Sequence, residues 1–258
     1  EDNLIIESVN KFLEKDVKPY VKEFESQDKY PQDIADKMAD LGLFGATISP
    51  EYGGLGLSAV TYSKIVENVS AVWMSVSGIF NSHLIMCAAV ERFGTEEMKR
   101  YYLPKFATGE IRGGIALTEP DCGTDLQSIK TKATKNNQTY TINGNKIWIT
   151  NSVQGDVLAV LVKTNSDINP PHKGMSLILV EKKSGEEKFT RSTRVPGLAA
   201  HRRPGRPIQS IRGAAAGRQP SAHRVVGPAA AQAGRADRAR HLGDLVARHH
   251  VALDAQLG

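Results

Sequence analysis

The hydrophobic pattern changes period near residue 110, and this change constrains the fold of the 258-residue chain more than any other feature. Before it, apolar residues recur every three or four positions, as from Ile5 to Val21, which is the period of an amphipathic helix. After it, apolar and polar residues alternate over short runs, as from Ile129 to Thr134, which indicates strands. Helices followed by strands predict an α+β chain of two packed units.

Capping and breaking residues set the helix limits. We expect a first helix over residues 5–21, interrupted at Pro19, and further helices over residues 31–41, 58–69, 72–90 and 95–106. Together they predict an all-helical domain over residues 1–110. Ser58 and Thr95 suit N-caps, because their hydroxyls can accept a bond from the first helical turn. Residues 72–90 are almost uniformly apolar or small, and their length is marginal for a bilayer span. Because His83 and two other polar residues lie mid-segment, we predict a core helix, in which His83 is a satisfied core or interface histidine rather than a ligand.

The strands predicted for the second unit cover residues 113–117, 129–134, 139–142, 146–150, 157–162 and 175–180. Asn143-Gly144 separates two of these runs, and this dipeptide is typical of a tight hairpin turn. Cys87 and Cys122 make no disulfide framework, which indicates a reducing compartment.

Two short clusters carry groups suited to a flat ligand with polar edges. Residues 116–125 end a strand in a loop that holds the Thr118 and Thr124 hydroxyls, and Gly123 lets a phosphate approach the backbone. Trp148 and Thr150 add an indole and a hydroxyl. Each cluster also has a plainer interpretation, as a turn between strands and as a core tryptophan, and the residues alone leave both open.

Taken in order, the motifs resemble the acyl-CoA dehydrogenase family. Those similar to its middle domain are Gly113-Gly114, Thr118-Glu119-Pro120, Gly123-Thr124-Asp125, Asn143-Gly144 with Lys146, Trp148-Ile149-Thr150-Asn151 and Lys173-Gly174-Met175-Ser176. Residues 51–56 and 92–97 resemble its helical N-terminal domain. The resemblance covers residues 1–190 and departs at Thr124, where Ser is commoner, and at Cys122, where Ala or Gly is usual.

The resemblance implies a helical domain, a β-barrel-like middle domain over residues 111–190 and a C-terminal four-helix bundle, with FAD between the last two. The flavin contacts that it implies are Ile115, Ala116, Leu117, Thr118, Gly123, Thr124, Trp148, Ile149 and Thr150. Thr118 would bond the pyrimidine edge of the ring, Trp148 would shield one face, and Thr150 would lie near N5. Gly123 and Thr124 would lie near the pyrophosphate, and Thr124 would also contact the CoA part of the substrate.

The activity implied is α,β-dehydrogenation of an acyl-CoA, in which a carboxylate removes the α-proton, the flavin accepts a hydride and an electron-transfer flavoprotein receives the electrons. The intact family implies a homo-oligomer, and the expected location is the bacterial cytoplasm or the mitochondrial matrix. We expect no metal, membrane or nucleic-acid partner. Alternatives are an acyl-CoA oxidase or flavin monooxygenase on the same scaffold, and a non-catalytic flavin- or CoA-binding fragment.

The last quarter differs in composition. Residues 1–190 carry 18 Lys and 3 Arg against 25 acids, whereas residues 191–258 carry 12 Arg, no Lys and 3 Asp. The family's catalytic base is a Glu of the bundle, whose motifs are missing here, so we name no catalytic residue and expect a truncated chain that is inactive alone. The change in composition motivates the hypothesis that the tail is read in a shifted frame or is a chimeric join. A basic extension that binds nucleic acid or an acidic surface, and a tail without function, are rival hypotheses.

Overall fold

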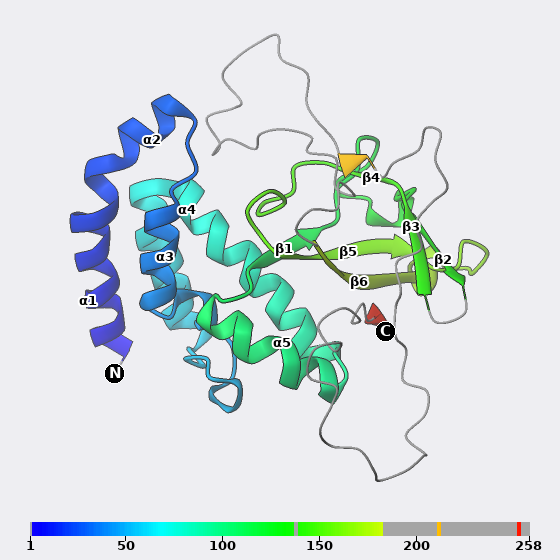
Figure 1. Cartoon of the computed structure of the whole chain (residues 1–258), viewed down its shortest axis with the longest axis horizontal. Coiled ribbons are helices and arrows are strands. Elements are labelled where there is room, and N and C mark those ends of the chain that lie inside the picture. Colours follow the sequence, from blue (N-terminus) through cyan, green and yellow to red (C-terminus); the bar gives the residue numbers. More distant parts are fainter. Residues whose placement is uncertain (1, 137–138, 183–210, 213–251, 254–258) are drawn as a thin grey trace, which may run out of the picture.

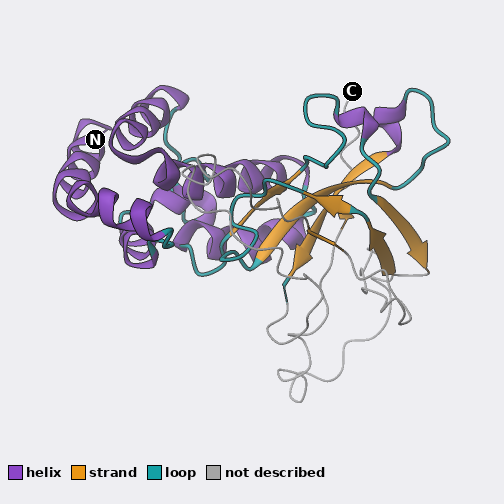
Figure 2. Ribbon diagram, turned by 90° about the horizontal axis from the view of Figure 1, so that it is seen from above, coloured by secondary structure: helices purple, strands orange, loops and turns teal. Residues whose placement is uncertain are grey.

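The computed structural model describes residues 2–136, 139–182, 211–212 and 252–253. Helices gather on one side of the molecule and strands on the other (Figures 1 and 2). The two sides meet where α4 (Ala59–Phe93) packs against β1 (Gly113–Ala116). The predicted α+β layout, with helices first and strands second, is confirmed. The predicted tail lies outside the described residues, apart from β7 (Ile211–Arg212) and β8 (Ala252–Leu253).

Sequence signals place most helix ends, but the first helical segment begins at Asp2 and continues to Gln27, beyond the predicted limits of 5–21. The other α-helices described are α1 (Asp2–Phe12), α2 (Val21–Gln27), α3 (Gln32–Asp40) and α5 (Glu96–Thr108). A π-helical turn and a 3-10 turn that contains Pro19 separate α1 from α2, as predicted. Ser58 and Thr95 cap α4 and α5, accepting backbone bonds from Thr61 at 3.1 Å and Met98 at 3.3 Å.

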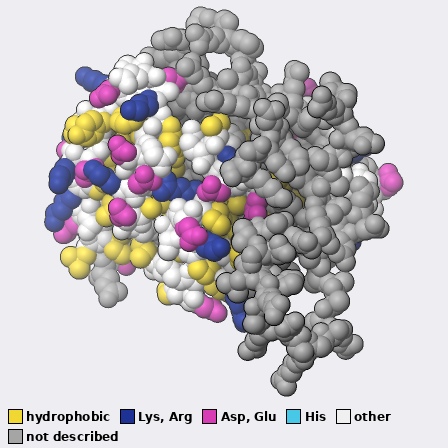
Figure 3. Space-filling view, viewed as in Figure 1, with side chains coloured by type: hydrophobic (Ala, Val, Ile, Leu, Met, Phe, Trp, Pro, Cys, Tyr) yellow, Lys and Arg dark blue, Asp and Glu magenta, His cyan; other side chains and the backbone are white. Residues whose placement is uncertain are grey.

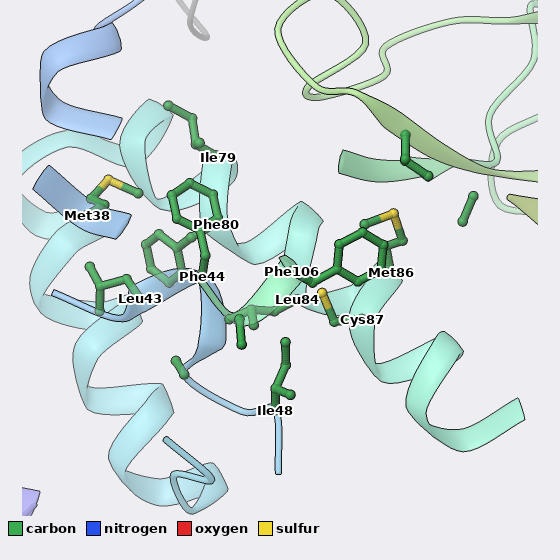
Figure 4. Packing of buried hydrophobic residues seen from close by; sticks show 14 of the residues in the cluster. Met38, Leu43, Phe44, Ile48, Ile79, Phe80, Leu84, Met86, Cys87 and Phe106 are labelled. Carbon is green, nitrogen blue, oxygen red and sulfur yellow. The ribbon is translucent and has the colours of Figure 1, made fainter. Parts of the chain in front are cut away.

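The helix α4 is broken at Trp73, whose backbone is extended, so that it corresponds to the two predicted segments 58–69 and 72–90. The Trp73 indole donates a hydrogen bond to Glu25 of α2. Within the described residues, α4 is the helix long and apolar enough to cross a membrane by length and composition alone. Half of the most apolar 18-residue stretch of α4 is buried inside the protein. Phe80, Met86 and their neighbours on this helix pack in the core (Figure 4).

One mixed sheet organises the second unit. Its other strands are β2 (Lys132–Asn136), β3 (Thr139–Asn143), β5 (Val157–Lys163) and β6 (Met175–Glu181), in the order β3-β2-β5-β6-β8 with β1 also paired to β5. The strand β1 runs parallel to β5, with Gly113 opposite Val157, and β2 joins β5 farther along, at Lys132 and Lys163. Since β6 occupies the other edge of β5, residues 117–131 leave the sheet after β1 and return to the same edge.

The predicted hairpin across Asn143-Gly144 is wrong. The strand β3 pairs instead with β2, and β4 (Asn145–Lys146) is only two residues long. A Cβ on Gly144 would lie 2.2 Å from the Thr131 hydroxyl, so close packing rather than a turn requires this glycine. The predicted strand over 146–150 gives way to a bend, because Trp148 and Asn151 have φ values of 60° and 63°.

The sheet is shared by two cores. Alternate residues of β5, among them Val157 and Ala159, face the helices and join the main core. The residues between them, Leu158 and Val160, join a second core with Ala116 on the opposite face. The helical domain and the sheet are therefore fixed against each other by one continuous hydrophobic layer, beside which the predicted site lies.

Candidate functional site at the edge of β1

A tight turn shapes the loop that follows β1. Glu119 and Cys122 exchange backbone hydrogen bonds, at 2.9 Å from the Glu119 amide and 3.2 Å from the Cys122 amide. The chain leaves this turn with Gly123 and Thr124 exposed. A Cβ built on Gly123 meets no protein atom within 4 Å, so the space over this backbone is open to a ligand.

The structure brings the two predicted clusters together. The Ile147 amide donates to the Thr118 carbonyl at 3.0 Å, which places Trp148 beside the loop after β1. Trp148 is 48% exposed, while Thr118 and Thr150 are half-buried. Among the described residues, neither threonine hydroxyl has a hydrogen-bond partner. Two available hydroxyls and an accessible indole fit a flat ring with polar edges.

Some predicted site residues turn their side chains away from this edge. Ala116 is fully buried and Ile149 is 4% exposed, and both pack into the second core. Ile115 and Leu117 are half-buried against the main core on the helical side. A ligand at this edge therefore reaches Ala116 and Ile149 only through their backbone.

Asn151 joins the two domains, a role that the sequence did not reveal. Its side-chain amide donates to the Ile79 carbonyl of α4 at 2.8 Å and to the Gly113 carbonyl of β1 at 2.7 Å. Its left-handed backbone is a signal that sequence can carry, because Asn tolerates this conformation better than most residues. Close packing at the same junction requires Gly114, since a Cβ there would lie 2.6 Å from the Thr150 carbonyl oxygen.

A buried ion pair lies under the loop. The Lys146 Nζ atom lies 2.8 Å from Glu119 Oε1 and 2.8 Å from the Leu117 carbonyl oxygen. The two side chains are 3% and 4% exposed. Glu119 also accepts bonds from the Lys130 amide at 2.5 Å, from the Thr131 amide at 3.0 Å and from the Thr131 hydroxyl.

Electrostatics keep this carboxyl group ionised. Burial by itself raises the pKa of Glu119, but the hydrogen bonds from Lys146 and Thr131 outweigh burial, and the pKa falls below its ordinary value. Burial lowers the pKa of Lys146, and Glu119 opposes that shift. Sequence analysis missed the pair because its members are 27 residues apart and no local spacing connects them.

The buried His83 ring also connects the domains. The Gly113 amide donates to His83 Nδ1 at 3.1 Å, so Nε2 carries the proton and donates to the Phe106 carbonyl at 3.1 Å. Burial, with a smaller contribution from the charge of Arg112, lowers the pKa of His83 to about 4, although the hydrogen bond to the Phe106 carbonyl opposes the shift. The predicted core histidine is thus confirmed, as a neutral bridge between α4, α5 and β1.

Two hollows lie elsewhere, on the helical domain. One of about 290 Å³ between α1 and α3 is lined by Lys11, Phe12, Lys15, Asp16, Lys37, Asp40 and Leu41, and one of about 210 Å³ adjoins α1 and α4. Both are open to solvent, and charges of both signs are interspersed over this domain (Figure 3). Neither hollow is lined by a residue of the predicted site.

The fold is that of an α+β protein in which a helical unit packs against a mixed sheet, with the Thr118 hydroxyl and the Trp148 indole beside the end of β1. The sequence profile "Acyl-CoA dehydrogenase, N-terminal domain" matches residues 1–110, and "Acyl-CoA dehydrogenase, middle domain" matches residues 114–205. The chain belongs to the acyl-CoA dehydrogenase family. The second match runs past residue 190, where the motifs recognisable in the sequence end.

Individual relatives agree with this assignment. The chain is 36% identical over 183 residues to the short-chain-specific acyl-CoA dehydrogenase of Clostridium acetobutylicum, covering 70% of this chain and 48% of that protein. The acyl-CoA dehydrogenase of Geobacillus kaustophilus is 31% identical with a TM-score of 0.72, over 86% of this chain and 56% of the other. A glutaryl-CoA dehydrogenase of Mycobacterium smegmatis in complex with FADH2 is 26% identical with a TM-score of 0.67, over 75% and 48%. The chain spans about half the length of the relatives it matches.

Proposed function

We propose that the chain forms the N-terminal and middle part of an FAD-dependent acyl-CoA dehydrogenase. One observation carries the proposal: the bond from the Ile147 amide to the Thr118 carbonyl sets the accessible indole of Trp148 beside Thr118, whose hydroxyl has no hydrogen-bond partner among the described residues. The family assignment supports it, as does the relative whose structure holds FADH2.

In this proposal the residues at the edge of β1 hold and orient the cofactor. Thr118 donates to the polar edge of the ring, Trp148 covers one face and keeps water from it, and Thr150 lies on the side of the hydride-accepting nitrogen. The open backbone at Gly123 and the Thr124 hydroxyl face the pyrophosphate, and Thr124 also contacts the CoA part of the substrate. When bound, FAD supplies an acceptor for the hydride that leaves the acyl chain.

Glu119 does not serve as the base that removes the α-proton. Its carboxylate is buried, ionised and committed to Lys146, Lys130 and Thr131. We assign no other acid of the described residues to this step, so the chain alone is predicted to bind FAD without turning over an acyl-CoA. Transfer of electrons to a flavoprotein, self-association, and location in the bacterial cytoplasm or the mitochondrial matrix are parts of the same proposal.

FAD titration of the flavin-free 258-residue chain tests the site. Thr118→Val removes one hydrogen bond and should weaken FAD binding about fivefold. Trp148→Ala should weaken it about tenfold or more, because the ring loses an aromatic contact. As a control, Thr134→Val makes the same Thr-to-Val substitution at an exposed position of β2, and it should leave the affinity for FAD unchanged. Equal affinities in all four proteins would refute the proposed seat.

Assays with acyl-CoA separate the alternatives. With a dye as electron acceptor, we expect the chain alone to give no product from any acyl-CoA between butyryl- and palmitoyl-CoA. Substrate-dependent oxygen consumption would favour an oxidase or a monooxygenase instead. Robust turnover with the dye would refute the prediction of inactivity.

A further inference from the structure

We propose that the Glu119–Lys146 pair is a positioning element, which fixes Thr118 relative to Trp148 and anchors the loop that carries Gly123 and Thr124. The inference rests on the proposed function, since it concerns how the FAD seat is held in shape. It assigns both residues to positioning and neither to contact with a ligand.

The first part of the evidence is how Lys146 surrounds Thr118. Its ammonium group bonds the carbonyl of Leu117, one residue before Thr118, and the carboxylate of Glu119, one residue after it. The carbonyl of Thr118 itself accepts the Ile147 amide. Residues 117–119, directly after β1, are therefore hydrogen-bonded to residues 146 and 147, directly before Trp148. The backbone of Thr118 is fixed, and its hydroxyl can move only by rotation of the side chain.

The second part is how Glu119 closes the loop. Its carboxylate binds the amides of Lys130 and Thr131, so both ends of the segment 119–131 are fixed at one carboxyl group. Gly123 and Thr124 lie inside that segment and are exposed. The two ends of the loop are therefore held in fixed positions, although the residues at its tip are exposed to solvent.

Directional bonding distinguishes this pair from ordinary core packing. Two apolar side chains could fill the same volume, but they would leave the Leu117 carbonyl and the two amides without partners. Hydrogen bonds to backbone groups fix position to a fraction of an ångström, which a binding seat requires and a hydrophobic contact does not provide. The pair's value to the site therefore lies in geometry more than in fold stability.

The test uses the 258-residue chain with Lys146→Met, and with Lys18→Met as a control. The control makes the same change and breaks an exposed Lys–Glu pair on the helical domain, where the two side chains are 60% and 65% exposed. In the flavin-free protein, amide hydrogen exchange at Thr131 and Ile147 should be at least tenfold faster in Lys146→Met, with α5 unchanged. Lys18→Met should exchange like the wild type at these positions.

FAD binding supplies a second, independent measurement. The dissociation constant, expressed per folded molecule, should rise at least tenfold in Lys146→Met and stay unchanged in Lys18→Met. If Lys146→Met does not fold, Thr131→Val removes one bond to Glu119 and should shift both measurements in the same direction by a smaller factor.

The outcomes separate the inference from the proposed function. Unchanged exchange at Thr131 and Ile147, faster exchange spread evenly over the whole chain, or unchanged FAD affinity in Lys146→Met overturns the inference. If the wild-type chain binds no FAD, the proposed function fails for this chain, and the exchange measurement then decides the positioning role by itself.

Discussion

Acidification should weaken the junction between the two domains through His83. The ring lies fully buried between the Gly113 amide, which donates to Nδ1, and the Phe106 carbonyl, which accepts from Nε2. A second proton would have to take the place of the Gly113 hydrogen bond, inside the core. The folded protein therefore resists protonation of His83, whereas the unfolded chain does not.

The size of the effect follows from the two pKa values. The unfolded chain binds the proton near pH 6.5, and the folded protein only near pH 4. Between these values the unfolded state holds more protons, so stability is complete above pH 6.5 and falls as the pH falls towards 4. At about 1.4 kcal/mol per pKa unit, the loss due to His83 is about 2.5 kcal/mol at pH 4.5.

Urea unfolding at pH 7.5 and pH 4.5, followed by tryptophan fluorescence, measures this loss. His83→Gln keeps a donor and an acceptor but cannot be protonated, so the stability difference between the two pH values should shrink by about 2.5 kcal/mol. His172→Gln, on the turn Pro171–Gly174 outside the core, should behave like the wild type. If His83→Gln keeps the full acid sensitivity of the wild type, the reasoning is wrong.

Substitutions at three further positions test the packing at the junction and the open loop by urea unfolding and FAD titration. Gly114→Ala sets a methyl group 2.6 Å from the Thr150 carbonyl oxygen and should lower the free energy of unfolding by about 2–3 kcal/mol. Gly123→Ala meets nothing within 4 Å and should leave unfolding unchanged to about 0.5 kcal/mol while weakening FAD binding. Asn151→Ala loses both interdomain bonds and places Ala at a φ of 63°, so a loss of about 2–4 kcal/mol is expected; Asn151→Gly, which accepts that φ, should lose less. Equal stability of Gly114→Ala and Gly123→Ala, or of Asn151→Ala and the wild type, would contradict these expectations.

Much of the fold could be predicted because its signals are local. The hydroxyls of Ser58 and Thr95 cap their helices by accepting hydrogen bonds from amides only three residues farther along the chain. The apolar runs that begin at Val157 and Met175 are strands. The failed hairpin shows the limit of local reasoning. Asn143-Gly144 has the composition of a tight turn, yet Gly144 serves the close approach of Thr131, a residue that is distant in sequence.

The sequence proposed the candidate site as a set of residues but could not give their arrangement. Motif order identified Thr118, Gly123 and Trp148, and the structure sets the first and last of these side by side through the Ile147 amide. Nothing in the sequence separated Ala116, whose side chain is sealed in the second core, from Thr118, whose hydroxyl is available. That distinction arises because β1 ends at Ala116, so that Thr118 lies beyond the strand, in the loop that leaves the sheet.

The sequence by itself determined the order of helices and strands, the helix caps and the family to which the chain belongs, because periodicity, capping and short motifs act over a few residues. Only the tertiary structure decided that Lys146 pairs with Glu119, that Asn151 bonds α4 to β1 and that the His83 ring bonds Gly113 and Phe106. These contacts join residues 23 to 72 positions apart. The packing of the sheet against the helices determines which of these distant residues come into contact, and a local sequence pattern carries no information about that packing.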